Sequence, residues 1–252
     1  MSEQVGAANA ESFQVPGSVL VPARVWADIV AGQEGWAKID EAARRLRDCG
    51  LAGADGRLAP VVPAVTAAVA DILPSARRLI RLRLYRPDGN RRVDLYTGGI
   101  QAVMADFIGD RVSFSLVSPE FVPSWVASVL CLGPRGVPAW ESVEVYSPLA
   151  QALVDEDAGL VSVSVRRLAG ARVVAAMAQV AQAIQAGQWR LGTIAAGKPP
   201  LADDSQMLAF LDTTAGLVSL ESPANGMLRL NAARTYGIWS VIVPMIYPRD
   251  SS

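Results

Sequence analysis

The stretch RRLIRLRLYRPDGNRRVDLY, from Arg77 to Tyr96, decides the fold class of this chain. Its first half alternates apolar and charged side chains as far as Arg86, and this is the period of a half-buried strand. The tetrapeptide PDGN then predicts a turn, because proline presets φ and because glycine and asparagine tolerate positive φ. A return strand from Arg91 to Tyr96 completes the predicted hairpin.

Alternation also assigns the side chains of this hairpin to two faces. We expect the apolar face to pack inward; it consists of Ile80, Leu82, Leu84, Val93 and Leu95. We expect the other face to lie in solvent and, together with the turn, to contact a protein partner; this set is Arg81, Arg83, Tyr85, Asp88, Arg92, Asp94 and Tyr96. Arginine and tyrosine are enriched at protein interfaces because each combines a large apolar body with polar reach. The alternative is an ordinary solvated sheet face on which Arg83 or Arg92 pairs with Asp94.

The segments around the hairpin extend it into an α+β fold. Residues 19–30 predict a short strand broken at Pro22 and then a turn of helix, and apolar spacing predicts helices over 38–49 and 61–73. The other expected strands are 101–108, 112–118, 189–195, 207–212, 217–221, 227–231 and 237–246, with a short helix opened by Pro123 and a longer one over 169–187. Helix followed by meander therefore occurs twice.

We predict a central antiparallel sheet built from two quasi-repeated halves, about 16–140 and 141–247, within a single domain of residues 16–247. Residues 1–15 are expected to form a mobile N-terminus and residues 248–252 a tail. The N-terminus lacks a basic and apolar leader, and the apolar runs are too short to span a bilayer, so we expect no signal peptide and no membrane insertion.

Composition argues against most catalytic chemistry. The 252 residues contain no histidine, which removes imidazole bases, Ser-His-Asp arrangements and histidine metal ligands. The cysteines, Cys49 and Cys131, are too few for a thiolate zinc site. We favour two reduced thiols, although one bridge between them stays open. A net charge of −1 provides no overall field that would attract nucleic acid. We therefore expect no enzyme activity, no cofactor and no metal.

Two other functions compete with protein binding. Seven arginines lie between Arg77 and Arg92, so the sheet face could bind nucleic acid, although Asp88 and Asp94 interrupt the positive charge. An enzyme built on carboxylates such as Asp203 or Asp94 is the less favoured alternative. The near match GTIAAGKP to a phosphate-binding loop has proline where the motif needs a hydroxyl residue, so we do not assign a nucleotide site.

Several segments resemble the EspG family, the secretion-associated proteins of actinobacterial type VII (ESX) systems. They are EAARRLRDCGL (41–51), DGRLAP (55–60), the arginine-rich hairpin, AGQWRLGT (186–193), LDTTAGLVSL (211–220) and GIWSVIVP (237–244), and the resemblance covers about residues 19–246. It implies a quasi-two-fold antiparallel sheet flanked by helical bundles. Family members commonly end with a further helix after the last strand. Here the sequence stops at residues 248–252, so we expect that helix to be absent or its place to be filled otherwise.

The resemblance also implies a function. Proteins of this family are cytosolic chaperones that bind the helical tip of PE–PPE protein pairs, cover its apolar surface and bring the pair to the secretion machine. The expected contacts are the sheet face, the hairpin turn and part of the C-terminal half. We therefore expect a cytoplasmic monomer or weak homodimer that binds a PE–PPE type pair and no nucleic acid.

Overall fold

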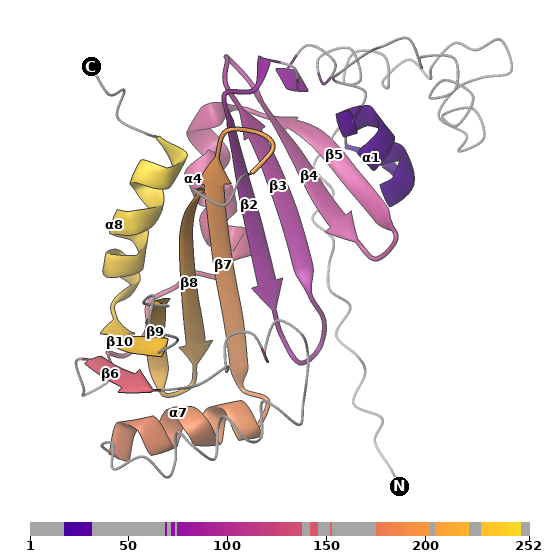
Figure 1. Cartoon of the computed structure of the whole chain (residues 1–252). Coiled ribbons are helices and arrows are strands. Elements are labelled where there is room, and N and C mark those ends of the chain that lie inside the picture. The colour runs from indigo at the N-terminus through magenta and orange to yellow at the C-terminus, as the bar shows by residue number, and fades with distance from the viewer. Residues whose placement is uncertain are drawn as a thin grey trace, which may run out of the picture.

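The computed structural model describes residues 18–31, 69, 72–73, 75–137, 142–145, 152, 175–201, 205–221 and 228–247. Within these residues, ten strands form one antiparallel sheet in the order β1-β5-β4-β3-β2-β7-β8-β9-β10-β6 (Figure 1). The strands are β1 (Val19–Pro22), β2 (Arg78–Tyr85), β3 (Arg91–Thr97), β4 (Ala102–Ile108), β5 (Arg111–Val117), β6 (Ser142–Val145), β7 (Trp189–Gly197), β8 (Gln206–Thr213), β9 (Gly216–Glu221) and β10 (Leu228–Ala233). The helices are α1 (Ala23–Ala31), α4 (Val122–Val129), α7 (Ala175–Gln185) and α8 (Thr235–Ile246), with a 3₁₀ turn η3 (Pro119–Phe121) before α4.

Pairing between β2 and β7 joins two meanders into this sheet. Strands β2 to β5 form the first meander and α4 follows it, whereas β7 to β10 form the second and α8 follows that. The register places Leu82 opposite Val93 in β3 and opposite Ile194 in β7. The expected α+β fold with a central antiparallel sheet is therefore confirmed. Strands β2 to β5 and β7 to β10 begin and end within two residues of the predicted positions, whereas no expected strand corresponds to β6.

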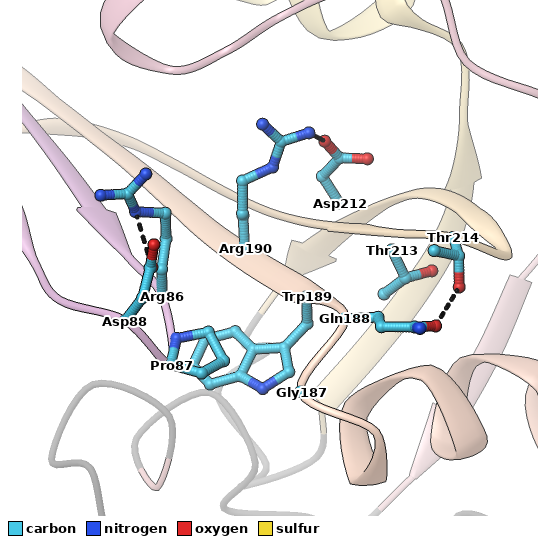
Figure 2. A pocket seen from close by; sticks show the side chains of 10 residues that line it. All are labelled: Arg86, Pro87, Asp88, Gly187, Gln188, Trp189, Arg190, Asp212, Thr213 and Thr214. Carbon is cyan, nitrogen blue, oxygen red and sulfur yellow. Dashed lines mark hydrogen bonds and ion pairs between the residues drawn. The ribbon is translucent and has the colours of Figure 1, made fainter. Parts of the chain in front are cut away.

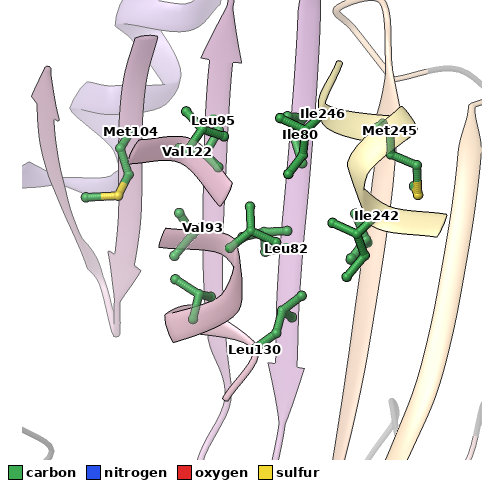
Figure 3. Close-up of a cluster of buried hydrophobic side chains, with 14 of the residues drawn as sticks. Ile80, Leu82, Val93, Leu95, Met104, Val122, Leu130, Ile242, Met245 and Ile246 are labelled. Carbon is green, nitrogen blue, oxygen red and sulfur yellow. The ribbon is translucent and has the colours of Figure 1, made fainter. Parts of the chain in front are cut away.

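One face of the sheet is covered by α4 and α8. Figure 3 shows the side chains of Ile80, Leu82, Val93 and Leu95 gathered under these two helices. From the helices, the buried members of this cluster are Val122, Val126, Val129, Leu130, Ile238, Ile242, Met245 and Ile246. The predicted inward set of the hairpin is thus confirmed as core, because Leu84 is buried as well.

The opposite face carries two separate apolar clusters, one mainly on β1 to β5 and the other mainly on β7 to β10. In the first, Trp26 of α1 and Leu73 pack on β1, β3, β4 and β5 around Tyr96 and Phe114. In the second, α7 packs on β7 to β10 with Ile184 and neighbouring residues. Arg81, Arg83, Arg92 and Asp94 lie between the two clusters, because they occupy the two rows of the register that separate Tyr96 from Tyr85.

The prediction of a strand over residues 237–246 is wrong, because these residues belong to helix α8. The β-branched run suggested a strand, yet the buried residues Ile238, Ile242, Met245 and Ile246 also have helical spacing. Packing decides the outcome, since the apolar face of β7 and β8 needs a cover. The expectation that no helix follows the last strand is wrong for the same reason, because α8 follows β10.

Other expectations concern segments that lie outside the described residues. The helix predicted over 38–49 falls there, as does most of the one over 61–73, of which Val69, Ile72 and Leu73 are described and helical. Helical bundles on both flanks are therefore not tested. Cys49 lies outside the described part as well, and Cys131 has a free thiol.

Gly192 shows how closely β7 and β8 approach each other. It lies directly opposite Phe210, and a β-carbon at position 192 would stand 2.3 Å from the Cζ atom of that fully buried ring. We therefore expect Gly192→Ala to lower the free energy of unfolding by about 2–3 kcal/mol, because the ring must leave its packed position. Urea unfolding measures this change. Gly99→Ala is the matched control, since no atom of the described residues lies within 4 Å of its added β-carbon. An equal loss in both variants would contradict the explanation.

Candidate partner-binding surface

Asp94 organises the polar centre of the hairpin's second face. Its carboxylate is fully buried and accepts hydrogen bonds from two guanidinium groups, one on each side. Arg81 donates through Nε and Nη2 at 3.0 Å each, and Arg92 donates through the same two atoms at 3.1 and 2.6 Å. The side chains of Arg81 and Arg92 are 26% and 35% exposed. The carboxylate of this ion-pair network is therefore buried, whereas its guanidinium groups reach solvent.

The same contacts set the proton affinities at this site. Burial by itself would raise the pKa of Asp94, but hydrogen bonds and positive charge from Arg92 and Arg81 hold this pKa below its ordinary value. Burial next to the Asp94 carboxylate raises the pKa of the neighbouring Tyr96 to about 12. Asp94 is therefore ionised and Tyr96 neutral under ordinary conditions.

The prediction that all of this face lies in solvent is wrong for three residues. Asp94, Tyr85 and Tyr96 are buried, although they share the expected face with Arg81, Arg83 and Arg92. The reason lies in distant parts of the chain: Tyr96 contacts the ring of Trp26 from α1, with centroids 6.2 Å apart, and Tyr85 belongs to the cluster under α7. The expected pair between Arg92 and Asp94 forms, and Arg81 rather than Arg83 supplies its second partner.

Arg83 differs from the other two arginines. Within the described residues, Arg83 donates a hydrogen bond from Nη1 to the Tyr85 hydroxyl oxygen at 3.3 Å and forms no ion pair with a carboxylate. Arg92, directly opposite in β3, also lies over the ring of Phe107 at 4.1 Å. We name Arg81, Arg83, Arg92 and Asp94 together the arginine strip.

The hairpin turn borders an open cavity of about 400 Å³ at one end of the sheet (Figure 2). Three connections line it, namely the β2–β3 turn, the link from α7 to β7 and the start of the β8–β9 turn. The lining residues are Arg86, Pro87, Asp88, Gly187, Gln188, Trp189, Arg190, Asp212, Thr213 and Thr214. Asp88 stands at the rim, 74% exposed and 3.2 Å from the Nε of Arg86. This cavity combines an aromatic side chain with charged and amide groups, and such a mixture suits a partner side chain with both apolar and polar parts.

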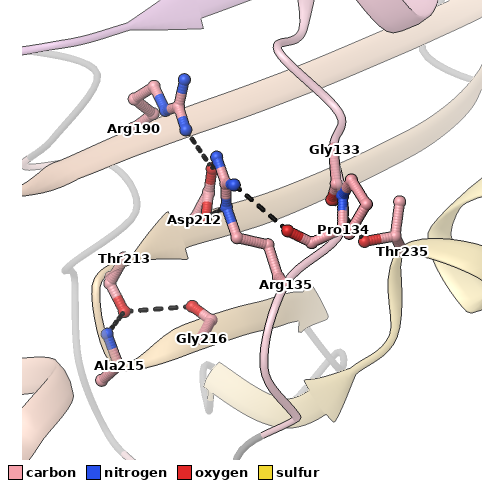
Figure 4. Close-up of polar contacts among 9 residues, drawn as sticks. All are labelled: Gly133, Pro134, Arg135, Arg190, Asp212, Thr213, Ala215, Gly216 and Thr235. Carbon is pink, nitrogen blue, oxygen red and sulfur yellow. Dashed lines mark hydrogen bonds and ion pairs between the residues drawn. The ribbon is translucent and has the colours of Figure 1, made fainter.

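A second ion-pair network fixes the position of one cavity residue. Asp212 accepts hydrogen bonds from Arg135 at 2.9 and 3.1 Å and from Arg190 at 2.6 Å (Figure 4). These hydrogen bonds also raise the pKa of Arg135. Arg135 belongs to the segment after α4, and the Thr235 hydroxyl donates to the Gly133 carbonyl in the same segment at 2.7 Å. The network ties the first half of the chain to the end of β8.

Sequence reasoning missed Asp212, Arg135 and Arg190. The ion pair joins residues 77 positions apart, and local spacing carries no signal for a contact across such a distance. Asp94, proposed as a catalytic carboxylate in the least favoured alternative, has both oxygens occupied by guanidinium groups. The other carboxylate in that alternative, Asp203, lies outside the described residues.

No group of three or more histidine, cysteine, aspartate or glutamate side chains among the described residues could hold a metal ion. Within the same residues, no helix is long and apolar enough to cross a membrane.

The buried carboxylate makes a prediction about stability. Replacing it by Asp94→Asn leaves two guanidinium groups side by side without their anion, and we expect the free energy of unfolding at pH 7 to fall by about 3 kcal/mol. Because the folded-state pKa of Asp94 lies below the unfolded value, its contribution is complete above about pH 5 and is lost as the pH falls below about 4. Chemical unfolding of both proteins between pH 7 and pH 3 measures this difference.

The control for this prediction is Asp88→Asn, which removes an exposed ion pair and is expected to change the stability by less than about 0.5 kcal/mol. If the difference in free energy of unfolding between wild type and Asp94→Asn stayed constant down to pH 3, the charge at this site would not stabilise the fold.

Comparison with known proteins gives one structural result. No protein-family model and no curated protein matches the sequence. Among solved structures, the chain is similar to the Mycobacterium tuberculosis type VII secretion system chaperone EspG5, determined in complex with the PE25–PPE41 dimer. The TM-score is 0.56 at 15% sequence identity, and the match covers 91% of this chain and 95% of the other. The resemblance expected from the sequence is therefore confirmed at the level of the fold: this chain has the fold of a type VII secretion chaperone.

Proposed function

We propose that this chain is a secretion chaperone that binds one end of a PE–PPE type protein pair and delivers the pair to a type VII secretion system. The observation that carries the proposal is the fold shared with EspG5, since the likeness extends over 91% of the chain. EspG5 itself is in complex with the PE25–PPE41 dimer. An enzymatic role has less support, because the carboxylate at the centre of the strip is saturated by arginine.

The proposed activity is binding without bond chemistry. A helical tip with exposed apolar side chains would aggregate on its own, and a chaperone that buries the tip lowers the free energy of the soluble state. The hairpin turn and the cavity beside it fit this task, because Pro87 and Trp189 present apolar surface while Asp88 and Arg190 present charge. Tip binding at this end of the sheet would leave the α4 and α8 face free.

The seven residues expected to bind the partner have different roles in this proposal. Arg83 and Asp88 contact the partner directly, since Asp88 is exposed and Arg83 is half-exposed with no ion-pair partner among the described residues. Arg81 and Arg92 contribute their exposed edges and hold Asp94 in place. Tyr85 and Tyr96 support the strip from the two apolar clusters.

The proposal also covers the organisation and location of the protein. We infer a single domain over residues 16–247 in which the halves 16–140 and 141–247 are a quasi-repeat, supported by two successive meanders that each precede a helix. We further propose that the protein is cytoplasmic, belongs to an actinobacterial ESX system and acts as a monomer or weak homodimer. Nucleic acid is the less favoured partner, because the chain carries a net charge of −1.

Charge reversal at the turn tests the proposed surface. We expect the wild-type chain, co-expressed with PE–PPE pairs from its own source genome, to form a stable complex with one pair in size-exclusion chromatography. Asp88→Arg should weaken that complex at least tenfold while leaving the melting temperature within about 1 °C, because an exposed ion pair contributes little to stability.

Asp110→Arg is the control, since it reverses the same charge in the β4–β5 turn of the same sheet and away from the cavity. If the wild-type chain forms no complex with any PE–PPE pair of that genome, the chaperone proposal is refuted. If Asp88→Arg binds the pair as tightly as the wild-type chain does, the binding surface does not include the hairpin turn.

A further inference from the structure

The arginine strip contains a like-charge pair that the fold does not require. Arg83 and Arg92 lie directly opposite each other in β2 and β3, on the same face of the sheet. Like charges in directly opposed positions destabilise a sheet. Arg92 is offset by Asp94, whereas Arg83 donates a hydrogen bond to the neutral Tyr85 hydroxyl. Within the described residues the strip thus holds three guanidinium groups and one carboxylate, so positive charge is in excess.

The strand beside the strip carries small, half-buried side chains on the same face. In the register, Thr193 of β7 lies opposite Arg83, and Ala195 of β7 lies opposite Arg81. One strand further, Met207 of β8 lies opposite Ala195 and is 73% exposed. Methionine is a flexible apolar side chain that adapts to different partners, and it is common at binding surfaces. This face therefore presents guanidinium groups on β2 and β3, the small side chains of Thr193 and Ala195 on β7, and the apolar side chain of Met207 on β8.

We infer that the arginine strip is a docking site for an acidic protein segment. The bound segment places a carboxylate between Arg83 and Arg92. It places an apolar side chain against Ala195 and Met207. Charge complementarity favours this occupant, since a carboxylate supplies the missing anion and matches the two-pronged geometry of guanidinium. A protein segment fits better than nucleic acid because Met207 and Ala195 offer apolar contact and because Asp94 lies in the same strip.

This inference adds the chemistry of the bound group to the proposed function and depends on that proposal for the partner's identity. Its test does not need the PE–PPE pair. The probe is the blocked peptide acetyl-Leu-Glu-Glu-Leu-amide, with a second peptide that has glutamine in place of both glutamates. NMR spectra of the full chain follow the arginine Nε–H signals while each peptide is titrated in.

We expect the glutamate peptide to shift the signals of Arg83 and Arg92 and to bind at least tenfold more tightly than the glutamine peptide. Arg83→Gln should weaken binding of the glutamate peptide about tenfold or more, and it keeps the Asp94 network intact. Arg111→Gln, at an exposed arginine of β5, is the matched control and should leave the affinity unchanged.

Equal binding of the two peptides, no shift at Arg83 and Arg92, or unchanged affinity in Arg83→Gln would each overturn the inference. So would a single-stranded uridine octanucleotide that binds these arginines more tightly than the glutamate peptide, because the strip would then be a nucleic-acid surface. Failure here, with a PE–PPE complex still formed by the wild-type chain, would refute the acidic docking site and leave the chaperone proposal standing.

Discussion

Pairing of β2 with β7 is the interaction on which the other features depend. It joins the two meanders, and it places β2 near the middle of the ten-stranded sheet with both faces in use. Leu82 packs under the helices on one face while Arg83 stands on the other. Because side chains alternate along a strand, a slip of one residue would exchange these two sets and bring guanidinium groups into the core. The register of β2 therefore fixes the core, the arginine strip and the direction of the hairpin turn together.

Burial of charge near the middle of the sheet is tolerated because Asp94 is fully satisfied. Two guanidinium groups occupy its oxygens, and their outer edges reach solvent, so the desolvation penalty falls mainly on one carboxylate. The apolar clusters to either side bring Tyr85 and Tyr96 against the network. The Asp94 network leaves Arg83 without a carboxylate partner among the described residues, and the proposed docking site relies on this arginine.

Local patterns in the sequence predicted the hairpin, both meanders and α4, because alternation and turn residues act over a few positions. They failed where distant segments decide the outcome. The run of β-branched residues in 237–246 reads as a strand, and it forms α8 because the face around Ile194 and Phe210 needs a cover. The burial of Tyr96 and Tyr85 depends in the same way on α1 and α7, which are distant from the hairpin in the sequence. Loose motifs in the sequence resemble the EspG family, and the 15% identity to EspG5 explains why the fold carries the stronger evidence.

Hydrogen exchange with and without a bound PE–PPE pair tests the central claim most directly, because it reports which backbone amides the partner covers. The proposed function predicts slower exchange in the hairpin turn from Arg86 to Arg91 and in the link from α7 into β7, around Gly187 to Arg190. Exchange in α8 should stay unchanged, since that helix covers the other face of the sheet. Protection confined to α8, with none at the hairpin turn, would contradict the proposed mode of binding.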